Sequence, residues 1–261
     1  MALTEAKIVD ERQSQVARPL LPPRARRPAA LVSVGCIAIT IVLGVITAHS
    51  SHPGAVDRAV DAWIQRGVGG HRRTLHLLED IAEPAEVAFL TLAVVVACLV
   101  ARRVNGAVLT VGSLAVSVAL TEFVLKPLFD RTLDGSLVYP SGHANRAFTL
   151  AAVLVVLLLN PPGRRRSRAL TIPAAAAAAL VGSAVAVAMI GLNYHYFTDA
   201  VGGAALAIAV VAGVSLLLDA KPMRRRLRLA SPDDSRPAAC PGTASPSRSF
   251  RRPCLPARPR T

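Results

Sequence analysis

Aromatic residues and cysteines are scarce in this chain. Aromatic side chains make up 4% of the 261 residues, and no stretch interleaves them with basic residues as nucleic-acid-binding surfaces do. The four cysteines show no CxxC pair and no Cys/His spacing typical of zinc; they are Cys36, Cys98, Cys240 and Cys254. A disulfide framework and a zinc site are therefore not expected.

Acidic residues are also few, with 16 Asp and Glu against 30 Lys and Arg, for a net charge of +14. In a soluble protein this charge would suggest nucleic acid as a partner. Here the basic residues flank hydrophobic blocks, which is typical of membrane topology. We therefore expect no nucleic-acid partner. No internal repeat or pair of Gly/Pro-broken helices is visible, which disfavours a transporter.

Long hydrophobic runs are the main feature that the chain does have. Hydrophobic residues make up 52% of it, and the mean hydropathy is +0.46. They fall in blocks near the length of a membrane-spanning helix, about 17 to 25 residues. We place six blocks at residues 30–48, 85–101, 104–125, 144–160, 172–192 and 197–218. The predicted fold is all-α: a polytopic membrane protein with a bundle of six transmembrane helices.

The chain divides into a membrane domain, residues 30–218, and two basic flanks, residues 1–29 and 219–261. The flanks are rich in Arg and Pro and are predicted to be disordered. The first loop, 49–84, contains apolar residues at helical spacing, among them Val60 and Trp63. This spacing predicts one or two short amphipathic helices at the membrane interface.

Loop charge predicts the orientation of the bundle. In a six-helix arrangement, 23 Lys and Arg fall on the side of the two termini and six on the other side. Positive residues favour the cytoplasmic side. Both termini are therefore expected in the cytoplasm, and the opposite loops on the extracytoplasmic side of the cell membrane.

Three short motifs lie on the side that is poor in positive charge. The first ends the third hydrophobic block and supplies two cations, Lys126 and Arg131, which could neutralise phosphoryl oxygens or simply snorkel to the interface. The second, Tyr139 to His143, places Ser141 and Gly142 before a helix. Free N–H groups at a helix start bind anions, although a capped membrane helix would need the same residues.

The third motif contains His195 and Asp199, spaced i, i+4 so that they share one helical face. A carboxylate in this position can fix the tautomer of the imidazole and make its other nitrogen more nucleophilic. The alternative is a hydrogen bond at a helix start. A metal site is less favoured, because oxygen-rich and Cys-rich ligand sets are absent from the sequence.

Together the three motifs resemble those of the type 2 phosphatidic acid phosphatase superfamily of membrane lipid phosphatases, over residues of about 85 to 218. The resemblance implies a six-helix bundle without a metal cofactor. It implies that His195 is the nucleophile of a phosphohistidine intermediate, that Asp199 orients it, and that His143 protonates the leaving alcohol. Lys126, Arg131, Ser141 and Gly142 would hold the phosphate.

The sequence departs from the family pattern at two places. Leu133 and Asp134 occupy the position of an Arg-Pro pair in the first motif, and Ala188 and Met189 replace the Ser-Arg of the third. We expect Arg146 to supply the missing cation, because it lies three residues after His143 in the first turn of an apolar helix. The alternative is that Arg146 only snorkels to the interface.

The sequence therefore favours a phosphatase that acts on lipid-linked phosphate or diphosphate at the outer leaflet. Candidate substrates are polyprenyl diphosphate, phosphatidic acid and phosphatidylglycerol phosphate, and the sequence does not choose between them. A lipid- or phosphate-binding protein that has lost catalysis is the second hypothesis, favoured by Met189. Vanadium haloperoxidases share the phosphate-site pattern and are a weaker alternative. The sequence predicts no oligomeric state.

Overall fold

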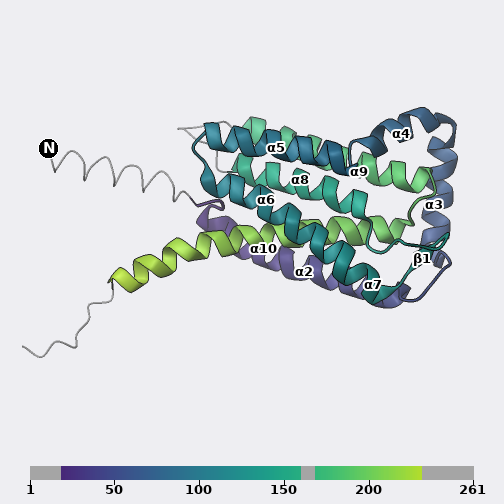
Figure 1. Cartoon of the computed structure of the whole chain (residues 1–261), viewed down its shortest axis with the longest axis horizontal. Coiled ribbons are helices and arrows are strands. Elements are labelled where there is room, and N and C mark those ends of the chain that lie inside the picture. The colour runs from purple at the N-terminus through teal and green to yellow at the C-terminus, as the bar shows by residue number, and fades with distance from the viewer. Residues whose placement is uncertain (1–18, 160–167, 231–261) are drawn as a thin grey trace, which may run out of the picture.

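The computed structural model describes residues 19–159 and 168–230, and places in them a bundle of long helices (Figure 1). The helices of the bundle are α2 (Pro23–Thr47), α5 (Pro84–Val100), α6 (Val104–Ala119), α7 (Lys126–Phe129), α8 (Gly142–Leu159), α9 (Arg168–Gly191) and α10 (Phe197–Ala230). A π-helical segment, η2 (Leu120–Leu125), joins α6 to α7. The described residues are mostly helical, which confirms the all-α prediction.

Five spans are long and apolar enough to cross a membrane: Pro23–Thr47, Val104–Phe129, Gly142–Leu159, Ile172–Gly191 and Phe197–Ala220. A sixth candidate contains α5, which follows the preceding helices with a bend of 49°. At 17 residues, α5 is about 25 Å long, close to the thickness of the hydrocarbon core. The chain is therefore an all-α polytopic membrane protein with five or six spans, in agreement with the predicted architecture.

The first loop forms helices that lie across one end of the bundle (Figure 1). They are α3 (Ala55–Val68), the 3₁₀ turn η1 (Gly69–His71) and α4 (Arg72–Asp80). The side chain of Trp63 on α3 is 71% exposed, whereas Ile64 is buried against the bundle. The predicted pair of short amphipathic helices is therefore present, and it covers the bundle end that contains the three motifs.

A small hairpin, which the sequence analysis did not predict, lies at the same end. Strands β1 (Thr132–Leu133) and β2 (Ser136–Leu137) pair antiparallel through a two-residue turn. The turn residues Asp134 and Gly135 both have positive φ, 49° and 78°. Asp-Gly is a preferred sequence for this type of turn, so a local signal was available.

The N-terminal end of α2 and the C-terminal end of α10 extend beyond their predicted boundaries. Helix α2 begins at Pro23 rather than at residue 30, and α10 continues to Ala230 rather than ending at 218. The two ends are tied together, because the backbone N–H groups of Leu20 and Leu21 donate to the carboxylate of Asp219, at 2.7 and 2.9 Å. The flanks predicted to be disordered were 1–29 and 219–261, and of these the residues 1–18 and 231–261 lie outside the described part of the chain.

Polar side chains connect the central helices α6, α8 and α10. The Ser117 hydroxyl donates to Oδ1 of Asn145 at 2.8 Å, and the Thr149 hydroxyl donates to Ser117 at 3.2 Å. The amide of Asn145 in turn donates to the carbonyl of Gly203. Such bonds between membrane helices contribute about 1 kcal/mol each, and here they fix the start of α8 against α10.

Candidate active site

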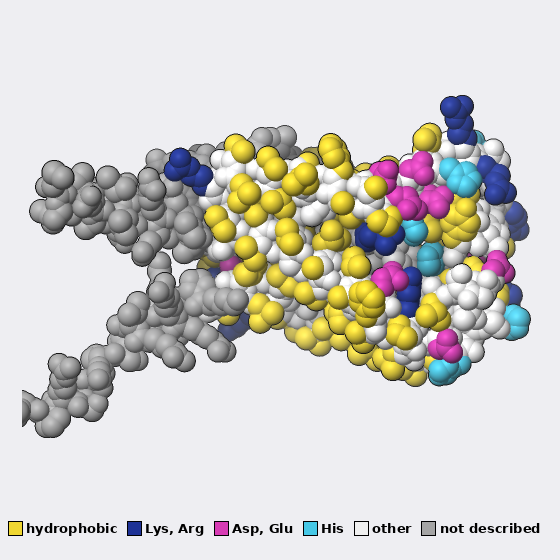
Figure 2. Space-filling model, viewed as in Figure 1, with side chains coloured by type: hydrophobic (Ala, Val, Ile, Leu, Met, Phe, Trp, Pro, Cys, Tyr) yellow, Lys and Arg dark blue, Asp and Glu magenta, His cyan; other side chains and the backbone are white. Residues whose placement is uncertain are grey.

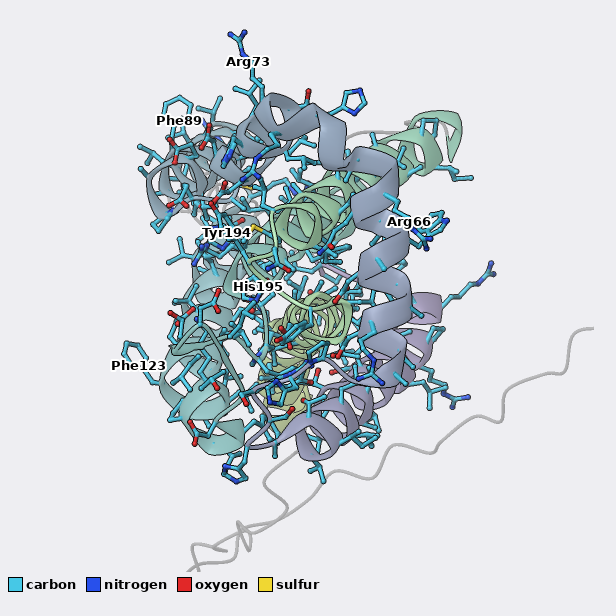
Figure 3. The ribbon with its side chains drawn as sticks, turned by 90° about the vertical axis from the view of Figure 1, so that its right-hand side faces the viewer. Arg66, Arg73, Phe89, Phe123, Tyr194 and His195 are labelled. Atoms are coloured by element: carbon cyan, nitrogen blue, oxygen red, sulfur yellow. The ribbon has the colours of Figure 1, made fainter. Side chains whose placement is uncertain are left out.

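A pocket of about 400 Å³ opens at the end of the bundle that α3, α4 and the hairpin cover. Figure 2 shows charged and histidine side chains gathered toward this end, while hydrophobic side chains cover the helices beside it. The polar lining includes Glu122, Lys126, His143, Arg146 and His195. Seen end-on in Figure 3, His195 lies near the middle of the bundle, whereas Arg66 and Arg73 project outward. The structure thus brings residues from all three motifs to one pocket.

The two histidines face the same pocket from different elements. His143 lies in the first turn of α8, and His195 lies in the turn that connects α9 to α10. Their ring centroids are 6.5 Å apart. His143 Nε2 lies 3.1 Å from a carboxylate oxygen of Glu83, just before α5. The sequence analysis missed Glu83, because an acidic residue before a membrane helix resembles an ordinary helix start.

Asp199 lies beside His195, as the i, i+4 spacing predicts. The distance from His195 Nδ1 to Asp199 Oδ2 is 3.8 Å, which is an ion-pair distance rather than a hydrogen bond. The same Oδ2 accepts the backbone N–H of Tyr196 at 2.9 Å, so the carboxylate also caps the start of α10. The helix-cap contact of Asp199 is thus a hydrogen bond, whereas His195 Nδ1 lies at ion-pair distance from the carboxylate and has no hydrogen-bond partner among the described residues.

Arg131 lies in a buried ion-pair network rather than in the pocket. Its side chain is fully buried, and it donates to Asp199 Oδ1 at 2.5 Å and to Asp57 Oδ2 at 2.6 Å. Its guanidinium also lies 4.4 Å from the centre of the Tyr196 ring. Among the described residues, those that line the pocket do not include Arg131. In this geometry the guanidinium of Arg131 forms ion pairs with the carboxylates of Asp57 and Asp199.

Asp57, on α3, is the opposite end of this network, and the sequence analysis did not single it out. It accepts hydrogen bonds from the N–H and the hydroxyl of Thr198, at 2.9 and 3.1 Å. Burial alone would raise the pKa of Asp57, but these bonds and the guanidinium of Arg131 bring it below its ordinary value. Asp57 therefore stays charged and joins α3 to the start of α10.

Ser141 and Gly142 begin α8 as predicted, but they face different surroundings. Ser141 is fully buried, and its hydroxyl accepts the N–H of Ala144 at 3.4 Å, as a helix cap does. Gly142 lines the pocket, and a Cβ atom there would lie 2.8 Å from Glu122 Oε1 and 3.5 Å from Arg146 Nη1. The absence of a side chain at Gly142 thus lets the Glu122 carboxylate and the Arg146 guanidinium approach the backbone of α8.

Lys126 and Arg146 are the two cations that line the pocket. Lys126 Nζ forms a 2.7 Å ion pair with Glu122, one turn earlier, which the sequence analysis did not select. Arg146 Nε donates to the carbonyl of Ala82 at 2.9 Å, and Nη1 of the same guanidinium lies beside Gly142. Arg146 therefore lies where a cation would be needed to bind an anion at the start of α8.

A scan against protein-family models matches the PAP2 superfamily over residues 87–222, just over half of the chain. The chain belongs to the PAP2 superfamily. Membership indicates a phosphatase, that is, a hydrolase of phosphoric esters. Searches of curated proteins and of solved structures found no match.

The PAP2 region contains the three motifs but not the helices that cover them. It begins within α5 and ends within α10, so α3, with Asp57, lies outside it. The buried contact between Asp57 and Arg131 therefore joins a segment outside the matched region to the PAP2 motifs. No sequence motif predicted this contact, because an acidic residue on an amphipathic helix usually faces solvent.

Met189, where the sequence analysis expected an arginine of the family pattern, has apolar surroundings. It is 1% exposed and packs in a cluster with Ala82 and Val185, against the partly buried Ala147. Arg146 is the chain neighbour of Ala147 and donates to the carbonyl of Ala82, so it borders this cluster directly. The geometry is compatible with the expected replacement of the missing cation by Arg146.

Three side chains near the pocket are spaced closely enough to share a cation. Ligand atoms of Glu79, Glu83 and His143 all lie within 4.8 Å of one another. Glu79 also pairs with His76 at 3.0 Å. One imidazole with two carboxylates supplies three donors, one fewer than a closed structural zinc site, and the predicted mechanism assigns His143 to proton transfer.

Proposed function

We propose that this PAP2 protein hydrolyses lipid-linked phosphate or diphosphate through a phosphohistidine intermediate. The observation that carries the proposal is the pair of histidines 6.5 Å apart across one pocket, beside Gly142 and two cations. A phosphoryl group between the rings would have a nucleophile on one side and a proton donor on the other. The candidate substrates remain phosphatidic acid, phosphatidylglycerol phosphate and polyprenyl diphosphate.

His195 is the proposed nucleophile. Its Nδ1 is directed at Asp199, so Nε2 is the nitrogen that would attack phosphorus. The N–P bond forms as the bond from phosphorus to the leaving oxygen breaks, and a proton passes from His143 to that oxygen. Water then attacks the phosphohistidine, inorganic phosphate leaves, and His195 is regenerated.

Lys126, Arg146 and the backbone of α8 at Gly142 are the proposed phosphate-binding groups. Cations and N–H groups that face the equatorial oxygens stabilise the transition state of phosphoryl transfer. Ser141 contributes by capping α8, and Arg131 by holding Asp199 in place. We thus assign Arg131 and Ser141 to positioning rather than to direct contact with phosphate.

The proposed site lies on the extracytoplasmic side of the cell membrane. Two observations support this orientation. The opposite loops contain an excess of Lys and Arg, and the hairpin that lines the pocket lies at the bundle end away from the start of α2 (Figure 1). Substrate would then be a lipid of the outer leaflet.

A lipid-phosphate-binding protein without catalysis is the second candidate. It is favoured by the apolar surroundings of Met189 and by the ion pair that partly neutralises Lys126. The two proposals differ in the role of His195. Hydrolysis requires it as a nucleophile, whereas binding alone requires no nucleophile.

Phosphate release by the purified protein in detergent separates the two. Wild type and His195→Ala would be assayed with phosphatidic acid, phosphatidylglycerol phosphate and a polyprenyl diphosphate, with EDTA present throughout. We expect release by the wild type alone, and acid-labile labelling of the wild type by ³²P-substrate. Saturable binding of a lipid phosphate without release would instead support the second candidate.

A further inference from the structure

Helix α3 presents a row of polar side chains to the turn that carries His195. Asp57, Asp61 and Gln65 follow one another at i, i+4 spacing, so they lie on one face of the helix. The two aspartates are buried, and Gln65 is half-buried. Because buried polar groups are nearly always hydrogen-bonded, the partners of this row show what α3 holds in place.

Gln65 holds the chain just before His195. Its Nε2 donates to the backbone carbonyl of Ile190, in the last turn of α9, and to Oδ1 of Asn193, both at 3.3 Å. Asn193 has a positive φ of 65° and lines the candidate active-site pocket. Gln65 therefore joins α3 to the point where the chain leaves α9 and turns toward His195.

The two aspartates hold the chain just after His195. Asp61 Oδ1 accepts the N–H of Phe197 at 3.0 Å, and Asp57 Oδ1 accepts the N–H of Thr198 at 2.9 Å. These are the first two residues of α10. The row on α3 therefore bonds to the backbone on both sides of His195.

The ring of His195 is not fixed by a hydrogen bond at Nδ1. This atom is buried, no described residue forms a hydrogen bond with it, and Asp199 lies 3.8 Å away. The backbone N–H of His195 donates to the carbonyl of Met189 only at 3.4 Å. The place of the imidazole in the pocket therefore depends on how firmly the flanking backbone is held.

Apolar side chains of α3 keep the polar row against the bundle. Ile64 packs in one buried cluster with Ile190 of α9 and Ala200 of α10, and the partly buried Val60 packs against the same cluster. One helix thus contacts both helices that the turn connects.

We propose that Asp57, Asp61 and Gln65 are positioning residues, which hold the turn between α9 and α10 so that His195 faces the phosphorus atom. This inference rests on the proposed function. It adds to the reaction a helix that lies outside the region matched by the family model, residues 87–222. The proposed phosphate-binding groups lie on α7 and α8, so a loosened turn should lower kcat and leave KM nearly unchanged.

Substitutions on α3 test the proposal. With the panel lipid that the wild type hydrolyses fastest, we expect Gln65→Ala and Asp61→Ala each to lower kcat about tenfold, with KM within about twofold. Asp61→Asn keeps an acceptor for the N–H of Phe197 and should recover most of the kcat that Asp61→Ala loses. Arg66→Ala is the matched control, because Arg66 follows Gln65 on α3 but projects away from the bundle (Figure 3).

Three results of this assay would overturn the proposal: wild-type kcat in both alanine variants, a rise in KM in place of the fall in kcat, or no recovery in Asp61→Asn. An equal loss of kcat in Arg66→Ala would overturn it as well. A melting curve in detergent establishes that each variant is folded.

The reactivity of His195 gives a readout that does not depend on hydrolysis. Diethylpyrocarbonate acylates imidazole nitrogen, and mass spectrometry of the peptides measures its rate at each histidine. We expect the rate at His195 to rise about fivefold in Gln65→Ala and Asp61→Ala, because a loosened turn opens more often. The rate at His143, on α8, should not change, and Arg66→Ala should change neither rate.

The two readouts separate the positioning role from the phosphatase. A rise in His195 reactivity in a protein that releases no phosphate from any panel lipid would support the hold of α3 on the turn and refute the phosphatase. Unchanged His195 reactivity in both alanine variants would refute the positioning role, whether or not the wild type releases phosphate.

Discussion

At the scale of single residues, the site depends on which cations touch substrate and which hold catalytic groups. Arg146 and Lys126 line the pocket, whereas Arg131 is buried between Asp57 and Asp199. The two arginines, Arg146 and Arg131, are therefore proposed to have different roles. Enzyme kinetics can separate these tasks, because a lost phosphate contact and a misplaced nucleophile affect KM and kcat differently.

We expect Arg131→Lys to lower kcat about 10- to 100-fold with KM within about twofold. A lysine cannot hold Asp57 and Asp199 with one planar fork, so Asp199 would no longer keep His195 in its attacking position. Steady-state kinetics with the best lipid of the panel measures the split, and a melting curve in detergent establishes that the variant is folded. A folded variant whose KM rises while kcat is unchanged would return Arg131 to phosphate binding.

Arg146→Ala provides the contrasting case. If Arg146 binds the phosphate as proposed, its removal should raise KM and lower kcat/KM by about 100-fold, as for other charge-stabilising groups in phosphoryl transfer. Arg66→Ala, at an exposed position on α3 that projects away from the pocket, is the control (Figure 3). Wild-type turnover and substrate affinity in Arg146→Ala would mean that this arginine only snorkels to the interface.

Asp61 lies on the face of α3 that covers the bundle. Its raised pKa should make the stability of the protein depend on pH. Burial, together with the charges of Asp57 and Asp199, raises its pKa from 3.8 to about 6, although the N–H of Phe197 donates to it. The folded protein thus binds more protons than the unfolded chain between these values, so this residue lowers stability as pH rises from about 4 to about 6. Asp61→Asn keeps an acceptor for Phe197 and removes the buried charge.

The Asp61→Asn variant should therefore be more stable than the wild type at pH 7, by up to about 2 kcal/mol, and equally stable near pH 4. Thermal unfolding in detergent from pH 4 to pH 8 tests this, with the exposed Asp80→Asn as the matched control. A gain in stability that is the same at every pH would contradict the titration of Asp61.

The residues that sequence reasoning found and those that it missed differ in a physical sense. His143, His195 and Asp199 were selected because they lie in short motifs, and their roles were assigned from the resemblance to the family. Asp57 and Glu83 were missed because each meets its partner across more than fifty residues, and only the folded chain brings them together. Arg131 is buried and Arg146 lines the pocket because of how the helices pack, and this packing could not be predicted from the sequence.

At the scale of elements, the close contact of α8 with α10 places the second motif against the third. Gly203 on α10 makes this approach possible, because a Cβ atom there would lie 2.4 Å from the carbonyl oxygen of Ser141. The N–H of Ser141 also donates to the carbonyl of Asp199, so the two helix starts are directly linked. The distance between His143 and His195 therefore depends on a small residue at position 203.

Gly203→Ala should destabilise the protein by about 2 kcal/mol, since the clash is with backbone that cannot rotate away. The melting temperature should fall by about 5 °C. Gly213→Ala, on the same helix with its nearest neighbour at 3.7 Å, should change the melting temperature little. A tolerated alanine at 203 would show that α8 and α10 pack less closely than this.

Element boundaries were the weaker part of the sequence-based prediction. The hydrophobic blocks located every spanning helix, because a bilayer imposes the length of an apolar run. They did not locate the ends of α2 and α10, which are extended by the contact of Leu20 and Leu21 with Asp219. The hairpin at Asp134–Gly135 was missed for the opposite reason, since its signal is local and only two residues long.

At the scale of the whole molecule, helices α3 and α4 and the hairpin lie at one end of the bundle (Figure 1), and residues of the hairpin line the pocket. The charge of the loops predicts that this end faces away from the cytoplasm. Accessibility of cysteines in intact cells tests this orientation directly. Arg73 lies on α4 and is exposed, so Arg73→Cys should react with a membrane-impermeant maleimide before cells are permeabilised. The native Cys240 and Cys254 provide an internal control, since the same prediction places them in the cytoplasm, where they should react only after permeabilisation. The reverse pattern would place the pocket on the cytoplasmic side and would make an inner-leaflet lipid the substrate.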